Sequence, residues 1–199
     1  MRNLITVFYE RIISMNQKTK KLTLSGVCLA LCLVLPFLTG QIPQIGSALS
    51  PMHIPVLLCG FICGWQYGLV VGLIAPVLRF LLFQMPPIFP TGTAMAFELA
   101  VYGAVTGILY HRLPKKNLNI YIALISAMLA GRIVWGCVQL VLSGVTKTPF
   151  TWQAFLSGAF IVAVPGIICH ILLIPPIVIA LKKAGVIEDE GNRKDYQAA

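Results

Sequence analysis

The sequence predicts an all-α membrane protein, built as a bundle of six transmembrane helices with both termini in the cytoplasm. Two observations predict this fold class. The chain has 199 residues, of which 58% are hydrophobic and 11% charged, and its mean hydropathy of +0.87 lies outside the range of soluble globular domains. Its apolar residues also form several runs close to the roughly 20 residues that a membrane-spanning helix needs.

The positive charges predict the orientation. The formal net charge is +9, and twelve of the 15 lysines and arginines lie in three clusters beside apolar runs. Such clusters are typical of cytoplasmic loops that contact anionic lipid headgroups, so the charge does not indicate a nucleic-acid partner. An even number of spans then puts both termini on that side. The clusters are Arg2, Arg11, Lys18, Lys20 and Lys21; Arg112, Lys115 and Lys116; and Lys182, Lys183, Arg193 and Lys194.

Residues 1–21 are predicted to be a cytoplasmic lead. They hold a weakly amphipathic piece, residues 4–13, and then the basic string NQKTKK. No small-residue cleavage site follows the first apolar run, so no signal peptide is predicted. Met15 stands where such a protein could start, and residues 1–14 are therefore interpreted as a candidate upstream extension, either mobile or lying on the inner membrane surface.

The first span is predicted at residues 22–39. Gly26 and Ala30 lie four residues apart on one face of this helix, the small-xxx-small pattern that lets two helices approach closely. Spacing alone favours packing of this face against the protein's own helices over docking on a partner.

Five further spans complete a membrane domain at residues 22–183. The second span is short for a full crossing, and the turn Trp65-Gln66-Tyr67 separates it from the third. Glycines recur every four residues from Gly60 to Gly72 across this turn, which predicts a tight hairpin with glycines at the crossing. The five spans are residues 51–64, 68–84, 93–110, 118–142 and 154–181.

Prolines in the last span predict breaks in its helix, and polar residues after it predict a tail. Pro165-Gly166 and Pro175-Pro176 are predicted to break the sixth helix, because proline removes a backbone donor. Residues 184–199 are polar and are predicted to form a disordered cytoplasmic tail.

Ionisable side chains inside the spans mark the candidate binding site, because a charge in a bilayer is costly unless it is paired or faces a cavity. A rise of about 1.5 Å per residue places His53 near the outer surface, with Arg79 and Glu98 at equal depth below it. These two are expected to pair. Arg132 is expected close to mid-membrane, and Gln139 lies seven residues further out on the same helical face.

The balance of these charges predicts the kind of ligand. Arg79 and Arg132 outnumber Glu98, so one positive charge is left unbalanced where its burial would cost several kcal/mol. A solute that enters from outside with a carboxylate or a phosphate would cancel it. The alternative is a structural Arg–Glu pair that only locks the helices. His170 falls in the inner half by the same count and is not expected to join the site.

The sequence carries no motif for catalysis or ATP binding. GxSxG, HExxH and P-loop patterns are missing, and no span carries a paired carboxylate, so we expect neither an enzyme nor ATP hydrolysis by this chain. The six cysteines lie in apolar runs, and the pairs Cys28/Cys32 and Cys59/Cys63 lack the histidine or acidic company of a metal site. They are therefore interpreted as packing residues, and no metal or cofactor is expected. An uptake subunit, a self-sufficient secondary transporter and a membrane assembly factor all stay open at this point.

About residues 18–183 resemble the substrate-binding S components of energy-coupling factor (ECF) vitamin transporters in bacteria. The resemblance rests on the length, on the first span KKLTLSGVCLALCLVLP, and on the block from SPMHIPVLLCGFICG to GTAMAFELAVYGAVTGILY, which is similar to the pantothenate-type branch. It implies a bacterial plasma-membrane protein that captures a vitamin from outside. The protein would then dock on a module of one scaffold membrane subunit and two ATPases.

The resemblance also implies residue roles. Docking in this family uses small residues spaced four apart on the first helix, here Gly26 and Ala30, while residues 40–49 and 84–93 match outer loops that close over the ligand. Together with the charges above, this predicts a small anionic vitamin, with pantothenate favoured and folate, riboflavin or pyridoxine as alternatives. The expected binding residues are His53, Arg79, Glu98, Arg132 and Gln139.

Overall fold

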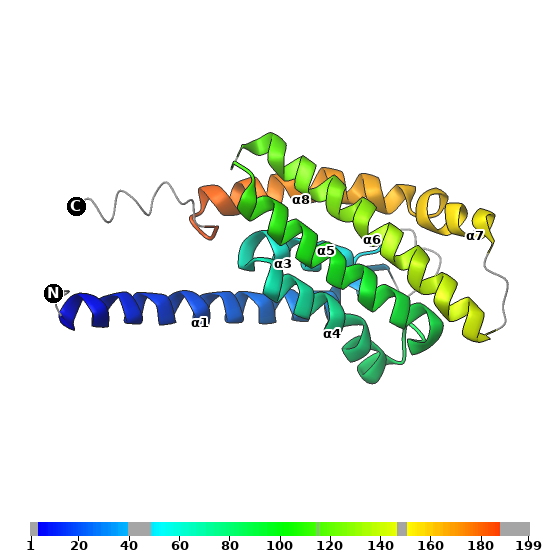
Figure 1. Cartoon of the computed structure of the whole chain (residues 1–199), viewed down its shortest axis with the longest axis horizontal. Coiled ribbons are helices and arrows are strands. Elements are labelled where there is room, and N and C mark those ends of the chain that lie inside the picture. Colours follow the sequence, from blue (N-terminus) through cyan, green and yellow to red (C-terminus); the bar gives the residue numbers. More distant parts are fainter. Residues whose placement is uncertain (1–3, 40–48, 115, 147–150, 188–199) are drawn as a thin grey trace.

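The computed structural model describes residues 4–39, 49–114, 116–146 and 151–187. Every regular element within these ranges is a helix (Figure 1), which confirms the predicted all-α class. The elements are α1 (Leu4–Val34), η1 (Leu35–Thr39), α3 (His53–Cys63), α4 (Trp65–Phe83), η2 (Ile88–Gly92), α5 (Thr93–Arg112), α6 (Asn117–Thr146), α7 (Trp152–Leu156), η3 (Ser157–Ile161) and α8 (Val164–Lys183).

Five stretches within the described ranges are long and apolar enough to cross a membrane. They are Gln17–Leu38, Trp65–Phe83, Ile88–Arg112, Asn117–Val145 and Val164–Lys183. The predicted second span is also a helix, α3, but it has only 11 residues. It rises about 16 Å, roughly half the thickness of a hydrocarbon core, and cannot cross one alone. A bundle of six complete crossings, and its orientation, therefore remain predictions.

α5 lies at the centre of the bundle, between α4 and α6 (Figure 1), and the glycines explain how closely α3 and α4 approach it. A Cβ added to Gly68 would lie 2.7 Å from the carbonyl oxygen of Gly103 on α5, and one added to Gly60 would lie 2.6 Å from the same atom. Gly72 meets the backbone of Leu99 in the same way. The glycines thus pack α3 and α4 against α5, whereas the sequence predicted that they pack these two helices against each other.

The chain reverses between α3 and α4 at one residue. Gly64 has φ +96°, a backbone conformation that residues with a Cβ rarely adopt. Trp65, Gln66 and Tyr67, predicted to be the interrupting turn, instead form the first turn of α4. The break is shorter than predicted because glycine alone can make it.

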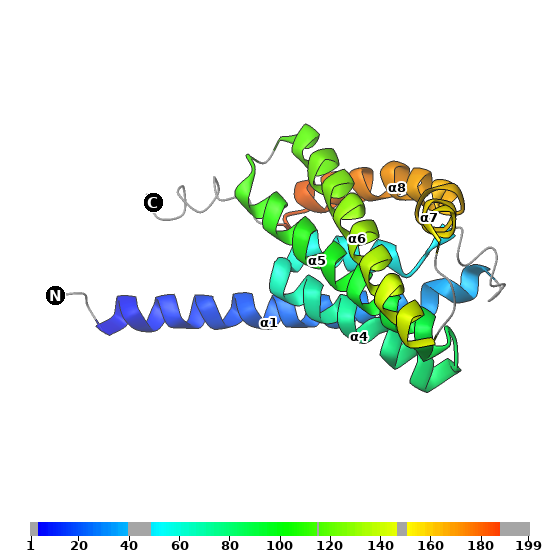
Figure 2. The ribbon, with the colours of Figure 1, turned by 45° about the vertical axis from the view of Figure 1, so that its right-hand side comes forward.

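α1 runs along one side of the bundle, against α3 and α4, and projects beyond the other helices (Figure 1, Figure 2). The helix begins at Leu4, so the part of the lead that the structure describes continues directly into the first span. Cys28 and Cys32 face the core, while Gly26 and Ala30 are exposed on the other side. Of the five candidate spans, this one is the least buried within the chain.

The predicted sixth span is divided before its first proline. α7 and η3 come first, and α8 then begins at Val164 with Pro165 in its first turn, where no backbone donor is needed. Pro175 and Pro176 lie inside α8, which continues to Lys183. The predicted break at Pro175-Pro176 is therefore wrong: packing against α6 and α3 keeps the helix continuous.

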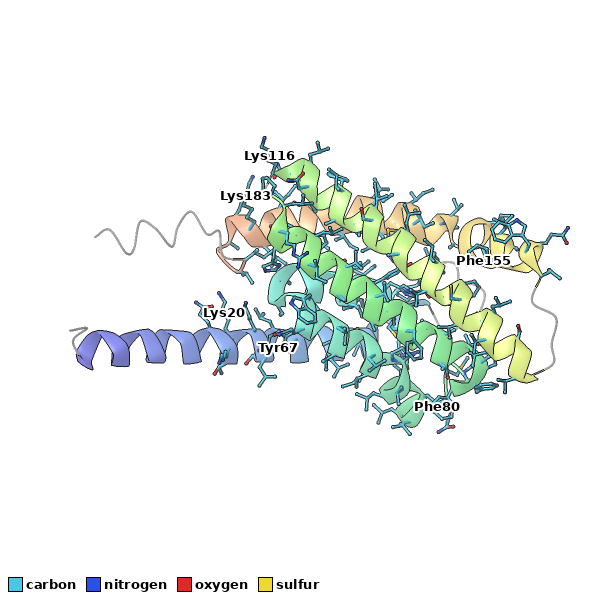
Figure 3. All side chains as sticks on the ribbon, viewed as in Figure 1. Lys20, Tyr67, Phe80, Lys116, Phe155 and Lys183 are labelled. Atoms are coloured by element: carbon cyan, nitrogen blue, oxygen red, sulfur yellow. The ribbon has the colours of Figure 1, made fainter. Side chains whose placement is uncertain are left out.

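One lysine from each basic cluster can be placed, and the three lie toward the same end of the molecule. Figure 3 shows Lys20, Lys116 and Lys183 toward the end of the molecule at which α1 begins and α8 ends. Phe80 and Phe155 lie toward the other end. These three lysines would thus lie toward the same side of a membrane.

Candidate functional site

Glu98, on the central helix α5, is the hub of a buried polar cluster. Its carboxylate is only 2% exposed, and its Oε1 lies 3.0 Å from Nη1 of Arg132 on α6. The hydroxyl of Tyr102, one turn further along α5, donates to the same oxygen over 3.0 Å. A carboxylate removed from water needs such partners, because an unpaired buried charge is strongly destabilising.

A pair of histidines lies against this carboxylate. Nε2 of His53, the first residue of α3, is 3.7 Å from Glu98 Oε2. The His53 ring meets the Tyr102 ring edge-on at 5.3 Å and stacks on the His170 ring of α8 at 5.9 Å. Both imidazoles are 2% exposed. Four helices thus meet at this cluster: α3, α5, α6 and α8.

His170 joins the cluster, which corrects the expectation that it lies outside the site; the sequence had placed it in the inner half of the membrane. The prediction counted depth along one long sixth span beginning at residue 154. Because α7 and η3 take up the first part of that stretch, His170 lies only six residues, about 9 Å, into α8. Its partner His53 begins a helix too short to start at the outer surface and cross the membrane.

The predicted pair of Arg79 and Glu98 is wrong, because Arg79 contacts other groups. Its Nη1 donates to the carbonyl oxygen of Leu33 over 2.6 Å. Its guanidinium carbon lies 5.3 Å from the centre of the Phe37 ring and 5.4 Å from that of Phe83. The arginine therefore satisfies a carbonyl in the last turn of α1, where the helix itself supplies no donor.

Tyr102 and Gly131 are two site residues that the sequence reasoning missed. A Cβ on Gly131 would overlap the ring of Tyr102, so this glycine leaves the space in which the ring reaches Glu98. The available signals were the spacing of Tyr102 from Glu98, which is i, i+4 on one helical face, and a glycine directly before Arg132.

Several buried nitrogen atoms of the cluster have no hydrogen-bond partner in the described structure. They are Nδ1 and Nε2 of His53, Nε of Arg132 and Nδ1 of His170. A buried polar atom without a partner costs about 1–3 kcal/mol, and native proteins hold few of them. These atoms belong to three side chains of one buried cluster, which is the arrangement expected of a site that receives a polar ligand or ordered water.

The remaining predicted residues lie apart from this cluster. Gln139 is half-buried on α6, about 10 Å beyond Arg132, so only a ligand extended along the helix would meet both. Gly26 is exposed, and a Cβ added to it would meet no other part of the described structure within 4 Å. Residues 40–48 of the first outer loop and residues 188–199 of the tail lie outside the described residues. The second outer loop is largely exposed and contains η2.

The cysteines of α1 and α3 belong to the core. Cys28, Cys32, Cys59 and Cys63 are buried and free of disulfides, and Cys32 Sγ donates to the Met52 carbonyl over 3.6 Å. Among the described residues, no group of three or more His, Cys, Asp or Glu side chains is placed to hold a metal ion.

Comparison with known proteins identifies the family. Residues 20–178 match the family described as ECF transporter, substrate-specific component. None of the curated proteins compared with the chain matches it. The match covers most of the chain, including every residue of the cluster around Glu98, and the family is one of transport components rather than enzymes. With its apolar helices and its buried polar cluster, the chain belongs to the substrate-specific components of ECF transporters.

Proposed function

We propose that this chain captures a small anionic vitamin at the outer side of a bacterial plasma membrane, pantothenate being the favoured case. It then delivers the vitamin through a module of one scaffold membrane subunit and two ATPases. The observation that carries the ligand proposal is the buried Glu98–Arg132 pair, surrounded by nitrogen atoms without partners.

Arg132 is the residue best placed to hold the ligand's carboxylate. One of its nitrogens, Nη1, is taken by Glu98, while Nε has no partner, and the side chain is 12% exposed against 3% for Glu98. Arginine can bind a carboxylate through two parallel hydrogen bonds, which lysine cannot copy. Arg79 is the weaker choice, because Leu33 and two phenylalanine rings already occupy its guanidinium.

The hydroxyl and amide groups of the vitamin would bind to His53, Glu98 and Gln139. His53 supplies a buried ring with a nitrogen that lacks a partner, and Glu98 Oε2 lies on the side that faces it. Gln139 lies further along α6, so it would bind the far end of an extended molecule. Pantothenate is such a molecule, with a carboxylate at one end, an amide in the middle and two hydroxyls at the other.

The exposed face of α1 is the proposed docking surface for the scaffold subunit. Gly26 and Ala30 are exposed there, and no other helix that the structure describes comes within 4 Å of a Cβ added to Gly26. Small residues in an unoccupied helix face allow a partner helix to approach closely. This finding opposes the alternative that the two residues serve internal packing. The end of the molecule toward which Lys20, Lys116 and Lys183 lie would face the cytoplasm, where the ATPases bind.

A binding titration tests the ligand. The purified chain is titrated with pantothenate, folate, riboflavin, thiamine and pyridoxine, and small molecules retained during purification are identified by mass spectrometry. Pantothenate should bind tightly, and Arg132→Ala should weaken binding by about 2–5 kcal/mol, with Arg132→Lys also clearly weaker. Tight binding of a neutral or cationic vitamin, with Arg132→Ala behaving like the wild type, would refute the anionic ligand.

A second experiment tests the partners. The tagged chain should co-purify with ATPase subunits from its host. Uptake that needs only a proton gradient and the isolated chain would indicate a self-sufficient secondary transporter instead.

A further inference from the structure

The cluster around Glu98 carries no net charge that would balance a bound anion. The sequence suggested a surplus positive charge, but Arg79 is bound elsewhere, so Glu98 and Arg132 balance each other when both histidines are neutral. A monoanionic ligand bound to Arg132 would then leave one net negative charge in a buried site. Burying such an uncompensated charge is costly, so a further positive charge is needed.

His53 is the group placed to supply that charge. Its Nε2 faces the Glu98 carboxylate, which can only accept a hydrogen bond, so the ring proton of the neutral form belongs on Nε2. Nδ1 then carries a lone pair, and this buried atom has no partner. Histidine is also the side chain whose charge most readily changes near neutral pH.

The groups around His53 favour the protonated ring there rather than on His170. Glu98 and Tyr102 face it from α5, Arg132 lies behind Glu98 on α6, and His170 stacks on it from α8. On the side of α1, the neutral thiol of Cys32 donates to Met52, the residue before His53. The nearest charge of opposite sign is thus the Glu98 carboxylate, which contacts His53.

The contacts of His170 favour a neutral ring. Its Nε2 lies 3.4 Å from the carbonyl oxygen of Ser50, which only accepts, so the proton of the neutral ring belongs on Nε2. Its Nδ1 is left as an acceptor without a partner. A neutral His170 can therefore receive a hydroxyl or amide hydrogen of the ligand while the stacked His53 carries the charge.

We propose that binding of the ligand anion is coupled to uptake of one proton by His53 Nδ1, which then donates to the ligand. The proton comes from the buffer acid, and no other bond is formed or broken. This inference rests on the proposed function, since it requires an anionic ligand at this site. Proton uptake would make the ligand bind more tightly at lower pH. It would also allow an anion to bind beside Glu98 and Arg132, whose own charges already cancel.

Titration calorimetry of the purified full chain with pantothenate tests the coupling. The binding enthalpy is measured at pH 7.5 in phosphate and in Tris, whose ionisation enthalpies differ, and the difference gives the number of protons taken up. The carboxyl group of pantothenate is ionised throughout the range used. We expect close to one proton, and a Kd that weakens by up to about tenfold per pH unit as the pH rises from 6 to 8. Pantothenol, in which an alcohol replaces the carboxylate, should bind without this proton.

Matched histidine variants locate the proton. His53→Gln keeps a hydrogen-bonding side chain that does not titrate, so its binding of pantothenate should show neither proton uptake nor dependence on pH. His111→Gln is the control, because His111 lies at the far end of α5, where its Nδ1 contacts the Gly107 carbonyl at 2.8 Å. It should behave like the wild type. Where His53→Gln does not fold, the comparison of pantothenate with pantothenol on the wild type still decides the question.

The outcomes separate the coupling from the proposed function. Tight binding of pantothenate without proton uptake would overturn the coupling and leave the anionic ligand in place. Uptake of the same proton by His53→Gln, or by the wild type with pantothenol, would also overturn it. Tight binding of a neutral or cationic vitamin in place of every anionic one would overturn both.

Discussion

Replacing Arg132 with methionine should destabilise the protein far more than replacing Arg132 and Glu98 together. The single change leaves buried Glu98, among the described residues, with the Tyr102 hydroxyl at 3.0 Å and His53 at 3.7 Å. Breaking a buried pair in this way costs about 3–5 kcal/mol. The attraction lost is of similar size, since two charges 3.0 Å apart at an effective dielectric constant near 20 attract by about 5.5 kcal/mol.

The double variant Arg132→Met with Glu98→Gln removes both charges. The amide oxygen introduced by Glu98→Gln can still accept a hydrogen bond from the Tyr102 hydroxyl, so no buried charge is left without a partner. We expect at least half of the lost stability to return. In a protein of this size each kcal/mol moves the unfolding midpoint by about 2–4 °C, so Tm of the single variant should fall by about 6–20 °C.

Thermal unfolding of the purified variants in one detergent at pH 7 measures this cycle. Arg112→Met is the matched control, because Arg112 is exposed at the end of α5 and its loss should change Tm little. Two results would contradict this expectation: an Arg132→Met variant as stable as Arg112→Met, or a double variant no more stable than Arg132→Met alone. Either result would mean that Glu98 does not depend on Arg132 for its charge balance.

Three further predictions address the other helices. Gly26→Leu or Ala30→Trp should abolish uptake by cells while the purified chain still binds its ligand; loss of both activities would instead indicate internal packing. Gly103→Leu should lower Tm sharply because its Cβ would overlap the backbone of α4, whereas Gly144→Leu, which has open space, should not; similar shifts would contradict a tight helix contact. Arg79→Gln should lower stability by about 1–3 kcal/mol but leave the affinity for pantothenate unchanged, and a marked fall in affinity by calorimetry would return Arg79 to the ligand site.

The differences between the predicted and the observed site have two geometric causes. Sequence position gives the depth of a residue only when the start of its helix is known, which was not so for His170. It also does not give the direction in which a side chain points. Successive residues of a helix are turned by about 100°, so an error of one or two residues in a span boundary changes the neighbour that a side chain meets. Arg79 and Glu98 were predicted to pair from depth alone, and Arg79 instead faces the end of α1.

The helical class was within reach of the sequence, because it depends on composition and on the lengths of apolar runs, and the family was within reach because about residues 18–183 resemble its members. The same holds for the presence of Glu98, Arg132 and His53 in one region, since each is a costly group in a membrane helix. Only the tertiary structure decided that Arg132 rather than Arg79 neutralises Glu98, and that His170 joins them. It also decided that the glycines of α3 and α4 face α5. These are contacts between helices far apart in the chain, and they depend on how each helix is rotated and how deep it begins, which local sequence patterns do not encode.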